Sequence, residues 1–146
     1  MTVRLQTEAF DPGAALKTFS GQLKNAGAVV SFTGVVRDVE VGLRHMEIEH
    51  YPGMTEKAIS EIVATARDRW PIVDVLVIHR HGQLRPGEVI MMVATASAHR
   101  KAAFEAAEYL MDYLKSRAPF WKKEITKVGA DWVAAKEDDE TALGRW

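Results

Sequence analysis

The chain has 146 residues, of which 47% are hydrophobic, so it can bury one sizeable core and we expect a single domain over 1–146. Charged residues make up 27% and balance to a net charge of -1, which excludes an overall positive field of the kind that holds duplex DNA. The sequence has no cysteine, which excludes disulfides, thiolate metal sites and a covalent sulfur intermediate on a protein thiol.

The N-terminal half predicts three strands and two helices. Asp11 offers a capping carboxylate and Pro12 suits the first helical position, so a helix is expected to begin there. Between residues 43 and 51, apolar and charged side chains alternate, as in a strand with one covered face. The expected elements are a strand at 3–6, a helix from 11 to near Gly21, strands at 26–36 and 43–51, and a helix that includes 58–66 and ends near Trp70.

The C-terminal half predicts four strands around one long helix. Helix 99–117 has Ser97 nearby as a candidate cap, and Pro119 ends it. The expected elements are strands at 72–81 and 88–97 joined by the loop 82–87, the helix 99–117, a strand pair at 120–127 and 131–135 turned at Val128–Gly129, and a charged tail at 136–140.

The order of these elements, β-α-β-β-α-β-β-α-β-β, does not alternate strictly. It therefore favours an α+β fold over a doubly wound one. We expect a mixed, largely antiparallel sheet packed by two or three helices on one side, with an extra C-terminal strand pair. No segment approaches the roughly 20 apolar residues of a membrane span, and the N-terminus has no signal-peptide pattern, so we expect a cytoplasmic location.

The two ends of helix 99–117 both carry basic residues. Lys115 and Arg117 suit the negative end of the helix dipole, so they are also compatible with simple dipole compensation and solubility. His99 and Arg100 oppose the dipole at the positive end, where free backbone N–H groups bind anions. This misfit favours an anion site at the start of the helix.

After Pro119 the side chains follow the period of a strand. The two faces carry Phe120, Lys122 and Glu124 on one side and Trp121, Lys123 and Ile125 on the other. Lysines beside large aromatic rings can hold a flat, negatively charged heterocycle by stacking and charge. An ordinary half-buried strand with lysines along its edge shows this pattern equally often. The spacing of the residues alone does not decide between a ligand-binding strand and an ordinary one.

Two other groups of polar residues are candidates for ligand binding. Arg37 follows a buried strand and could grip a phosphate or carboxylate, although Arg37 and Asp38 also fit a plain surface turn. His79 and His81 share a strand face, but no cysteine or well-placed carboxylate completes a metal site, so we expect no metal. Walker, dinucleotide and Gly-x-Ser-x-Gly motifs are absent from the sequence.

Five segments taken together identify a family. In their order and spacing they resemble the catalytic (large) subunits of molybdopterin synthase, over most of the chain. The segments are SFTGVVRD at 31–38, EHYPGMTEK at 49–57, SAHR at 97–100, DYLKSRAPFWKKE at 112–124 and GADWV at 129–133.

The resemblance implies an α/β hammerhead-like fold and a sulfurtransferase activity. The expected reaction moves sulfur to cyclic pyranopterin monophosphate and forms the dithiolene of molybdopterin. The sulfur arrives as a C-terminal thiocarboxylate on a small ubiquitin-like partner subunit with a Gly-Gly tail, which fits a chain without cysteine. No permanently bound cofactor is implied, because the pterin is the substrate.

The resemblance also implies which residues act. Lys115 and Lys122 match the family's catalytic lysines. The implied substrate-binding residues are Val35, Val36, Arg37, His99, Arg100, Lys115, Lys122, Lys123 and Glu124, with further contacts from Phe32 and Lys136.

Clustered positive charge should lower the pKa of at least one of the lysines Lys115, Lys122 and Lys123 beside Arg37. We expect Lys115 to transfer the proton and Lys122 to stabilise developing negative charge.

The positions of His99 and Lys115 predict a shared site. Sixteen positions apart on one helix, they are separated by roughly 24 Å at 1.5 Å per residue. One pterin cannot bridge that distance, so the His99–Arg100 end should meet the Lys115 end of a second copy. We therefore expect a homodimer within a heterotetramer, without nucleic acid or membrane partners.

Two alternatives remain at the level of sequence. A non-catalytic module could use the same basic and aromatic strand to bind a nucleotide or single-stranded nucleic acid, although the net charge of -1 disfavours it. A different sulfur-transfer or pterin enzyme could also be built on the same scaffold.

Overall fold

The computed structural model describes residues 1–134 and 136–146 and confirms an α+β fold. Its strands are β1 (Thr2–Gln6), β2 (Ala28–Val35), β3 (Leu43–His50), β4 (Ile72–Arg80), β5 (Gly82–Leu84), β6 (Val89–Ser97), β7 (Phe120–Thr126) and β8 (Gly129–Trp132). Its helices are α1 (Pro12–Gly21), α2 (Met54–Arg69), α3 (Arg100–Ser116) and α4 (Glu137–Ala142), followed by a 3-10 turn, η1 (Leu143–Arg145).

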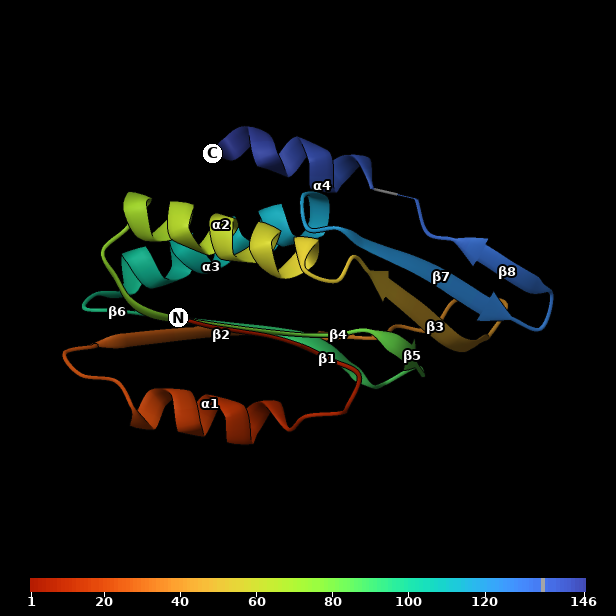
Figure 1. Ribbon diagram of the computed structural model, residues 1–146, viewed down its shortest axis with the longest axis horizontal. Coiled ribbons are helices and arrows are strands. Elements are labelled where there is room, and N and C mark those ends of the chain that lie inside the picture. Colours follow the sequence, from red (N-terminus) through yellow and green to blue (C-terminus); the bar gives the residue numbers. More distant parts are fainter. Residues whose placement is uncertain (135) are drawn as a thin grey trace.

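The strands form two four-stranded sheets. The main sheet has the order β1-β4-β6-β2, and the second sheet has the order β5-β3-β7-β8. Only the β1–β4 pair is parallel among the described pairings, so the predicted mixed, largely antiparallel character is confirmed. The second sheet extends to one side of the main sheet (Figure 1).

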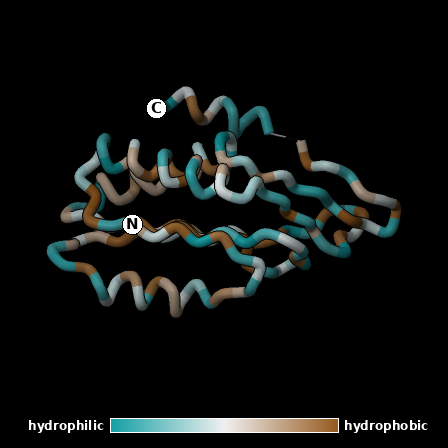
Figure 2. Tube along the Cα trace, viewed as in Figure 1, coloured by the Kyte–Doolittle hydropathy of each residue, from teal (hydrophilic) through white to brown (hydrophobic). Residues whose placement is uncertain are grey.

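Helices cover both faces of the main sheet. Helices α2 and α3 lie on one face and α1 lies on the other (Figure 1), so the prediction that helices lie on one side only is wrong. Phe19 of α1 packs with Ile78 and Met92 in a small second core. The central strands β4 and β6 are apolar at consecutive positions, and such strands are buried on both faces. In Figure 2, brown stretches run along the main sheet between the helices above and below it.

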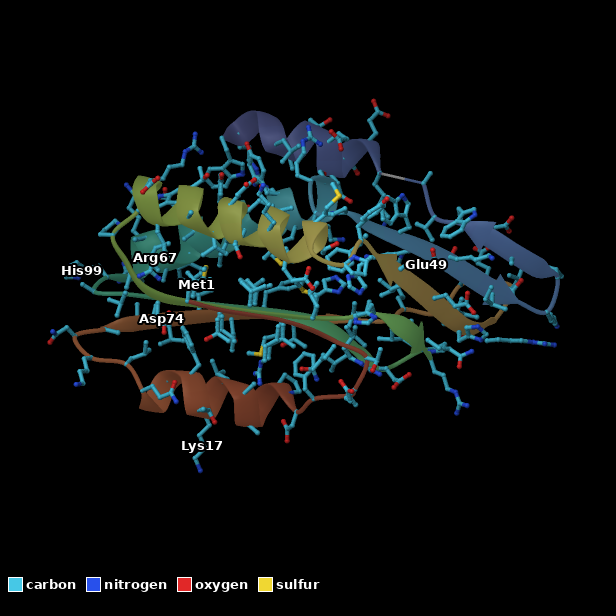
Figure 3. All side chains as sticks on the ribbon, in the orientation of Figure 1. Met1, Lys17, Glu49, Arg67, Asp74 and His99 are labelled. Atoms are coloured by element: carbon cyan, nitrogen blue, oxygen red, sulfur yellow. The ribbon has the colours of Figure 1, made fainter. Side chains whose placement is uncertain are left out.

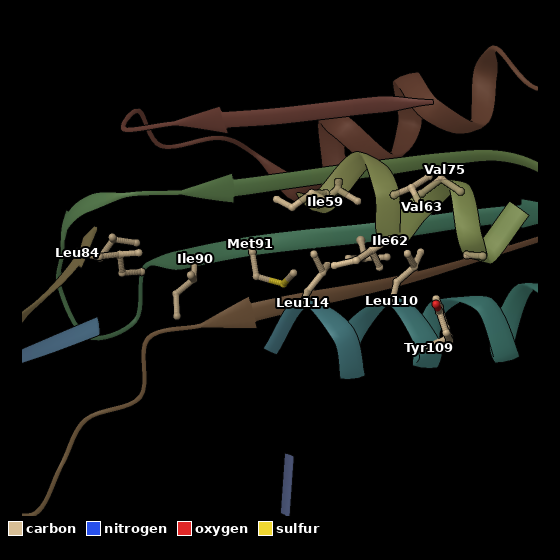
Figure 4. Packing of buried hydrophobic residues seen from close by; sticks show 14 of the residues in the cluster. Ile59, Ile62, Val63, Val75, Leu84, Ile90, Met91, Tyr109, Leu110 and Leu114 are labelled. Carbon is tan, nitrogen blue, oxygen red and sulfur yellow. The ribbon is translucent and has the colours of Figure 1, made fainter. Parts of the chain in front are cut away.

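The larger core lies between the main sheet and helices α2 and α3. Ile59 and Val63 of α2 meet Leu110 and Leu114 of α3 over Val75 of β4 (Figure 4). Each of these five side chains is buried. At about 25 cal/mol per Å² of apolar surface removed from water, this packing is the main force that fixes α3 on the sheet.

The C-terminal region differs from the prediction. The expected charged tail forms α4 and η1, because four acidic residues in the first turn of α4 suit the positive end of its dipole. Strand β8 covers Gly129–Trp132 instead of 131–135, and Ala135 lies outside the described residues. The expected loop 82–87 contains the short strand β5, which pairs with β3.

The C-terminal residue anchors this region to the helices. The ring of Trp146 packs edge-on against Trp70 and Tyr109, with centroids 5.4 and 5.6 Å apart. Its indole Nε1 donates to Asp112 Oδ2 at 2.6 Å. Arg145 forms salt bridges with Glu108 and Asp112 of α3. The chain end is therefore held on the outer side of α2 and α3.

Candidate active site

Lys115 and Lys122 lie on either side of the junction between α3 and β7. Lys115 is in the last turn of α3, as the sequence predicts, and Lys122 is the third residue of β7. The junction itself is fixed by Thr55 of α2, whose hydroxyl accepts from the Tyr51 N–H at 2.9 Å and donates to the Pro119 carbonyl at 3.2 Å. Thr55 is fully buried, so this hydrogen-bonded link holds the start of β7 in place.

The environment of Lys122 lowers its pKa. Burial is the largest cause, because it disfavours the charged amine, and the positive charge of Lys115 adds to it. The negative charge of Asp139 in α4 raises the pKa of Lys122, whereas the positive charge of Lys136, which precedes α4, lowers it. The predicted lowering by neighbouring positive charge thus has support at Lys122, but burial is its larger cause, and the neighbours are Lys115 and Lys136 instead of Lys123 and Arg37.

The run 122–124 is divided between the two faces of β7. Lys122 lies opposite Ile48 of β3, and Lys123 lies opposite Glu47 and, on the other side, Trp132 of β8. The Lys123 ammonium sits 5.2 Å from the centre of the Trp132 ring, a cation–π contact. Glu124 shares the face of Lys122 by strand alternation. Lys123 therefore points away from the face that carries Lys122.

The other predicted basic group lies at the start of α3. His99 is the N-cap residue of α3 and Arg100 is its first residue; no side chain caps this end. The Ser97 hydroxyl, a candidate cap, donates instead to the His99 carbonyl. A cavity of about 510 Å³ lies here, lined by Gly27, Ala28, Ala98, His99, Arg100 and Lys101. The cavity lies where the sequence predicts an anion site, and anion binding there stays a prediction.

Residues at the end of β2 lie toward the other end of the main sheet. Val35 pairs with Val89 at the start of β6, whereas Ala28 pairs with Ser97, next to His99. Val36 is buried, and Phe32, Val35 and Arg37 are exposed. Arg37 therefore extends from the end of the sheet that is nearer to β7.

The loop that follows Arg37 is held by Asp38. Its carboxylate accepts from the backbone N–H groups of Val39 and Leu43 at 2.8 and 2.6 Å. Both bonds lower the pKa of Asp38, and the bond from Leu43 has the larger effect. Within residues 1–134 and 136–146 no salt bridge joins Arg37 to Asp38, so the charge of Arg37 is available for an anion.

The candidate residues therefore form two groups in one chain. Lys115, Lys122 and Lys136 gather near the α3–β7 junction, while His99 and Arg100 lie at the opposite end of α3. Figure 3 labels His99 at one end of the molecule and, toward the other end, Glu49 of β3, which pairs with Trp121 of β7. The 17 residues of α3 span about 25 Å at 1.5 Å per residue.

Sequence reasoning did not predict that two residues, Asp139 and His79, lie near this site. Asp139 belongs to a helix that was expected to be a solvated tail, and the charge run gave no indication of its position near Lys122. His79 stacks on Phe120, and its place beside β7 depends on the meeting of two sheets. Among the described residues no cluster of His, Asp or Glu could hold a metal ion, and no described helix is long and apolar enough to cross a membrane.

Comparisons with known proteins agree on one family. The model of the MoaE protein family matches residues 5–117. A molybdopterin synthase catalytic subunit from Cereibacter sphaeroides is 66% identical over 146 residues, with 100% of both chains covered. A structure of a molybdopterin biosynthesis MoaE protein from Burkholderia ambifaria is 49% identical, with a TM-score of 0.86 over 99% of this chain and 97% of that one.

A more distant structure shares the fold. It is described as a protein–protein complex of subunits 1 and 2 of molybdopterin-converting factor from Helicobacter pylori. The matched chain is 23% identical, with a TM-score of 0.77 over 92% of this chain and 90% of that one.

Proposed function

The chain belongs to the MoaE protein family, as a molybdopterin synthase catalytic subunit in molybdenum cofactor biosynthesis, and on this premise we propose that it is a sulfurtransferase. It moves sulfur from the C-terminal thiocarboxylate of a small ubiquitin-like subunit to cyclic pyranopterin monophosphate. The product is the dithiolene of molybdopterin. The pterin is a substrate, and the chain holds no permanent cofactor.

The observation that carries this proposal is the environment of Lys122. The positive charges of Lys115 and Lys136 beside this covered lysine attract an anion such as a thiocarboxylate, and the lowered pKa of Lys122 suits it to act as a base. As a carbon–sulfur bond forms on the pterin, a carbon–oxygen bond at the same carbon breaks and its oxygen leaves. Attack of water on the carrier's acyl carbon then breaks the acyl carbon–sulfur bond, which leaves the sulfur on the pterin and an ordinary carboxylate on the carrier. Negative charge builds on the acyl oxygen, where nearby ammonium groups stabilise it more strongly than bulk water does.

Because the pKa of Lys122 is lowered, we assign proton transfer to Lys122 and charge stabilisation to Lys115, the reverse of the roles that the sequence suggested. Lys122 can lose its proton nearer to neutral pH and so acts as the base that takes a proton from the attacking water. Lys115, exposed at the end of α3, supplies positive charge to the developing oxyanion.

The partner subunit and a second copy of the chain complete the site. A relative with this fold is described as a complex of two subunits, which supports a partner subunit for this chain. In the proposed complex, the Gly-Gly tail of that partner reaches Lys122. The pterin phosphate is held by Arg37 together with His99 and Arg100 of the second copy, because α3 separates these two from Lys115 within one chain.

The proposed face for the second copy is the β2 edge of the main sheet. Strand β2 is its last strand, and the large apolar side chains Val29, Phe32 and Val35 are 39%, 42% and 50% exposed. Phe104 on α3 is 60% exposed. Burying these side chains between two copies removes apolar surface from water and closes an open strand edge. The resulting assembly is a homodimer of this chain within a heterotetramer.

Reconstitution tests the proposed reaction. The chain is mixed with a thiocarboxylated partner subunit and cyclic pyranopterin monophosphate, and the dithiolene product is detected by mass spectrometry. We expect product only when all three components are present. A partner that ends in an ordinary carboxylate is the control, and lack of product from competent reagents would refute the assignment.

A further inference from the structure

Three histidine rings gather where the main sheet meets the second sheet. His50 is the last residue of β3, His79 lies near the end of β4, and His81 follows β4. The His50 and His81 rings have centroids 4.1 Å apart, and the His79 ring stacks on Phe120 at 3.9 Å with an interplanar angle of 16°. Rings from two segments, the end of β3 and the end of β4, therefore line one wall beside β7.

This wall adjoins Lys122. In the antiparallel β3–β7 pair, His50 lies opposite Phe120 and Ile48 lies opposite Lys122. Residues that oppose each other share a face, and diagonal neighbours such as His50 and Lys122 are about 7–8 Å apart at their backbones, within reach of long side chains. The positive charge of Lys122 also acts on His79, so the lysine side chain extends toward the cluster.

The nitrogens of the three rings are not equally available. His79 Nδ1 lies 2.7 Å from the Arg80 carbonyl, and because a carbonyl only accepts, this nitrogen carries the proton. Burial first, and then the charges of Lys122, His81 and His50, together lower the pKa of His79 to about 4 against the opposing effect of its bond to the Arg80 carbonyl, so His79 stays neutral. His50 differs, because its buried Nδ1 has no hydrogen-bond partner in the described residues. A buried nitrogen without a hydrogen-bond partner is costly, so we expect this nitrogen to accept a proton or a hydrogen bond from a water.

A route from His50 to solvent passes His81. The His81 ring is only partly buried, and the carboxylates of Glu8, which follows β1, and Glu56 of α2 favour its charged form. Burial and the charge of His50 lower the pKa of His81. Two positive charges on rings in contact repel each other, so one extra proton on the pair is favoured over two. A single extra proton on the pair is therefore shared and is drawn toward the surface carboxylates.

We propose that His50, with His81 behind it, carries away the proton that Lys122 takes up in each turnover. The inference rests on the proposed role of Lys122 as a base. An O–H bond of the attacking water breaks and an Nζ–H bond forms on Lys122. The lysine then gives this proton through one water to His50 Nδ1, and His50 releases its Nε2 proton toward His81 and solvent. Proton number and charge balance, and the base is restored.

Substitution of His50 tests the relay in the assembled enzyme. In His50→Ala we expect kcat to fall about tenfold with KM unchanged, because proton removal becomes slow while binding is intact. Added imidazole should restore turnover in proportion to its neutral form, which a purely structural role would not produce. His45→Ala is the control, since His45 lies on the same strand but contacts Glu47 instead of the cluster. Unchanged kcat in His50→Ala, or a loss that imidazole does not restore, would overturn the proposal.

A second measurement does not depend on turnover. In His50→Phe, loss of the neighbouring charge should raise the pKa of His81, measured by NMR titration of its ring. An unmoved pKa would show that the rings are not coupled and would overturn the relay. If the wild-type enzyme forms no dithiolene while this pKa shift is seen, then the proposed function fails and the coupled pair stands. The two failures are thus distinguishable.

Discussion

Lys122 combines a titratable amine with a covered position on β7. Replacing it by methionine keeps the apolar stem and removes the charge and the base, so we expect turnover to fall about 100-fold or more. Lys122→Arg should be similarly poor, because a guanidinium keeps the charge but does not lose its proton near neutral pH. Steady-state kinetics of dithiolene formation provide the measurement.

Lys127→Met is the matched control for this prediction. Lys127 is exposed in the turn between β7 and β8, and the same chemical change there should leave turnover intact. If Lys122→Arg were as active as the wild type, Lys122 would act through charge alone, and its role as a base would be excluded.

His79 makes the stability of the fold depend on pH. Its pKa is about 4 when folded and 6.5 when unfolded, so the unfolded chain binds more protons between these values. The stabilisation is present above pH 6.5 and is lost as pH falls toward 4. From this group alone we expect a loss of about 2 kcal/mol in the free energy of unfolding between pH 7 and pH 5.

The matching variant for this pH effect is His79→Phe, which keeps a ring against Phe120 but cannot be protonated. It leaves the Arg80 carbonyl without its partner, a cost that does not change with pH. Urea unfolding of both proteins at pH 7 and pH 5 measures the difference. Equal losses on acidification in the two proteins would contradict the assignment of this effect to His79.

At the scale of elements, Thr55 connects α2 with the α3–β7 junction. In Thr55→Val the Tyr51 N–H and the Pro119 carbonyl lose their partner at a buried position, so the free energy of unfolding should fall by about 1–3 kcal/mol. Because the start of β7 also becomes less fixed, kcat should fall at temperatures where the protein is still folded. Urea unfolding and kinetics measure the two effects.

Thr18→Val provides the control for the Thr55 substitution. Thr18 is exposed on α1, on the opposite face of the main sheet, and the same change there should cost at most a few tenths of a kcal/mol. Equal destabilisation by the two substitutions would show that the link through Thr55 contributes nothing specific.

Local sequence signals predicted most elements, because their causes are local. Asp11 caps α1 through bonds to the Gly13 and Ala14 N–H groups, as expected, and strand alternation placed Lys122 and Lys123 on opposite faces of β7. The position of α1 could not be predicted in this way. A continuous apolar run in β4 shows that the strand is buried, but it does not show which helix covers each face.

The candidate site shows the same limit. The resemblance to a known family identified Lys115 and Lys122, whose motifs are contiguous in sequence. Asp139 and His50 could not be recognised, because their proximity to Lys122 depends on the docking of α4 and on the register of β3 with β7. Contacts between distant segments have no signature in a single sequence when the residue types are ordinary.

At the scale of the whole molecule, the length of α3 is the reason for proposing a site shared by two copies. Lys115 of one copy and Arg100 of the other would build one site, and two such sites would form in each dimer. A dimer of one Arg100→Ala chain with one Lys115→Ala chain then holds one site with both residues intact and one site with neither.

Mixing these two inactive variants therefore tests the geometry. When they are unfolded together and refolded at equal concentrations, half of the dimers should be mixed, so activity should recover to about a quarter of the wild-type value. Mass spectrometry of intact dimers verifies the mixing, and each variant refolded alone is the control. If verified mixed dimers stay inactive, both residues serve a site within one chain, and the 17 residues of α3 would have to be bridged by the substrate or by the partner's tail. A substrate of pterin size does not span the helix, so the shared site is the arrangement that its length favours.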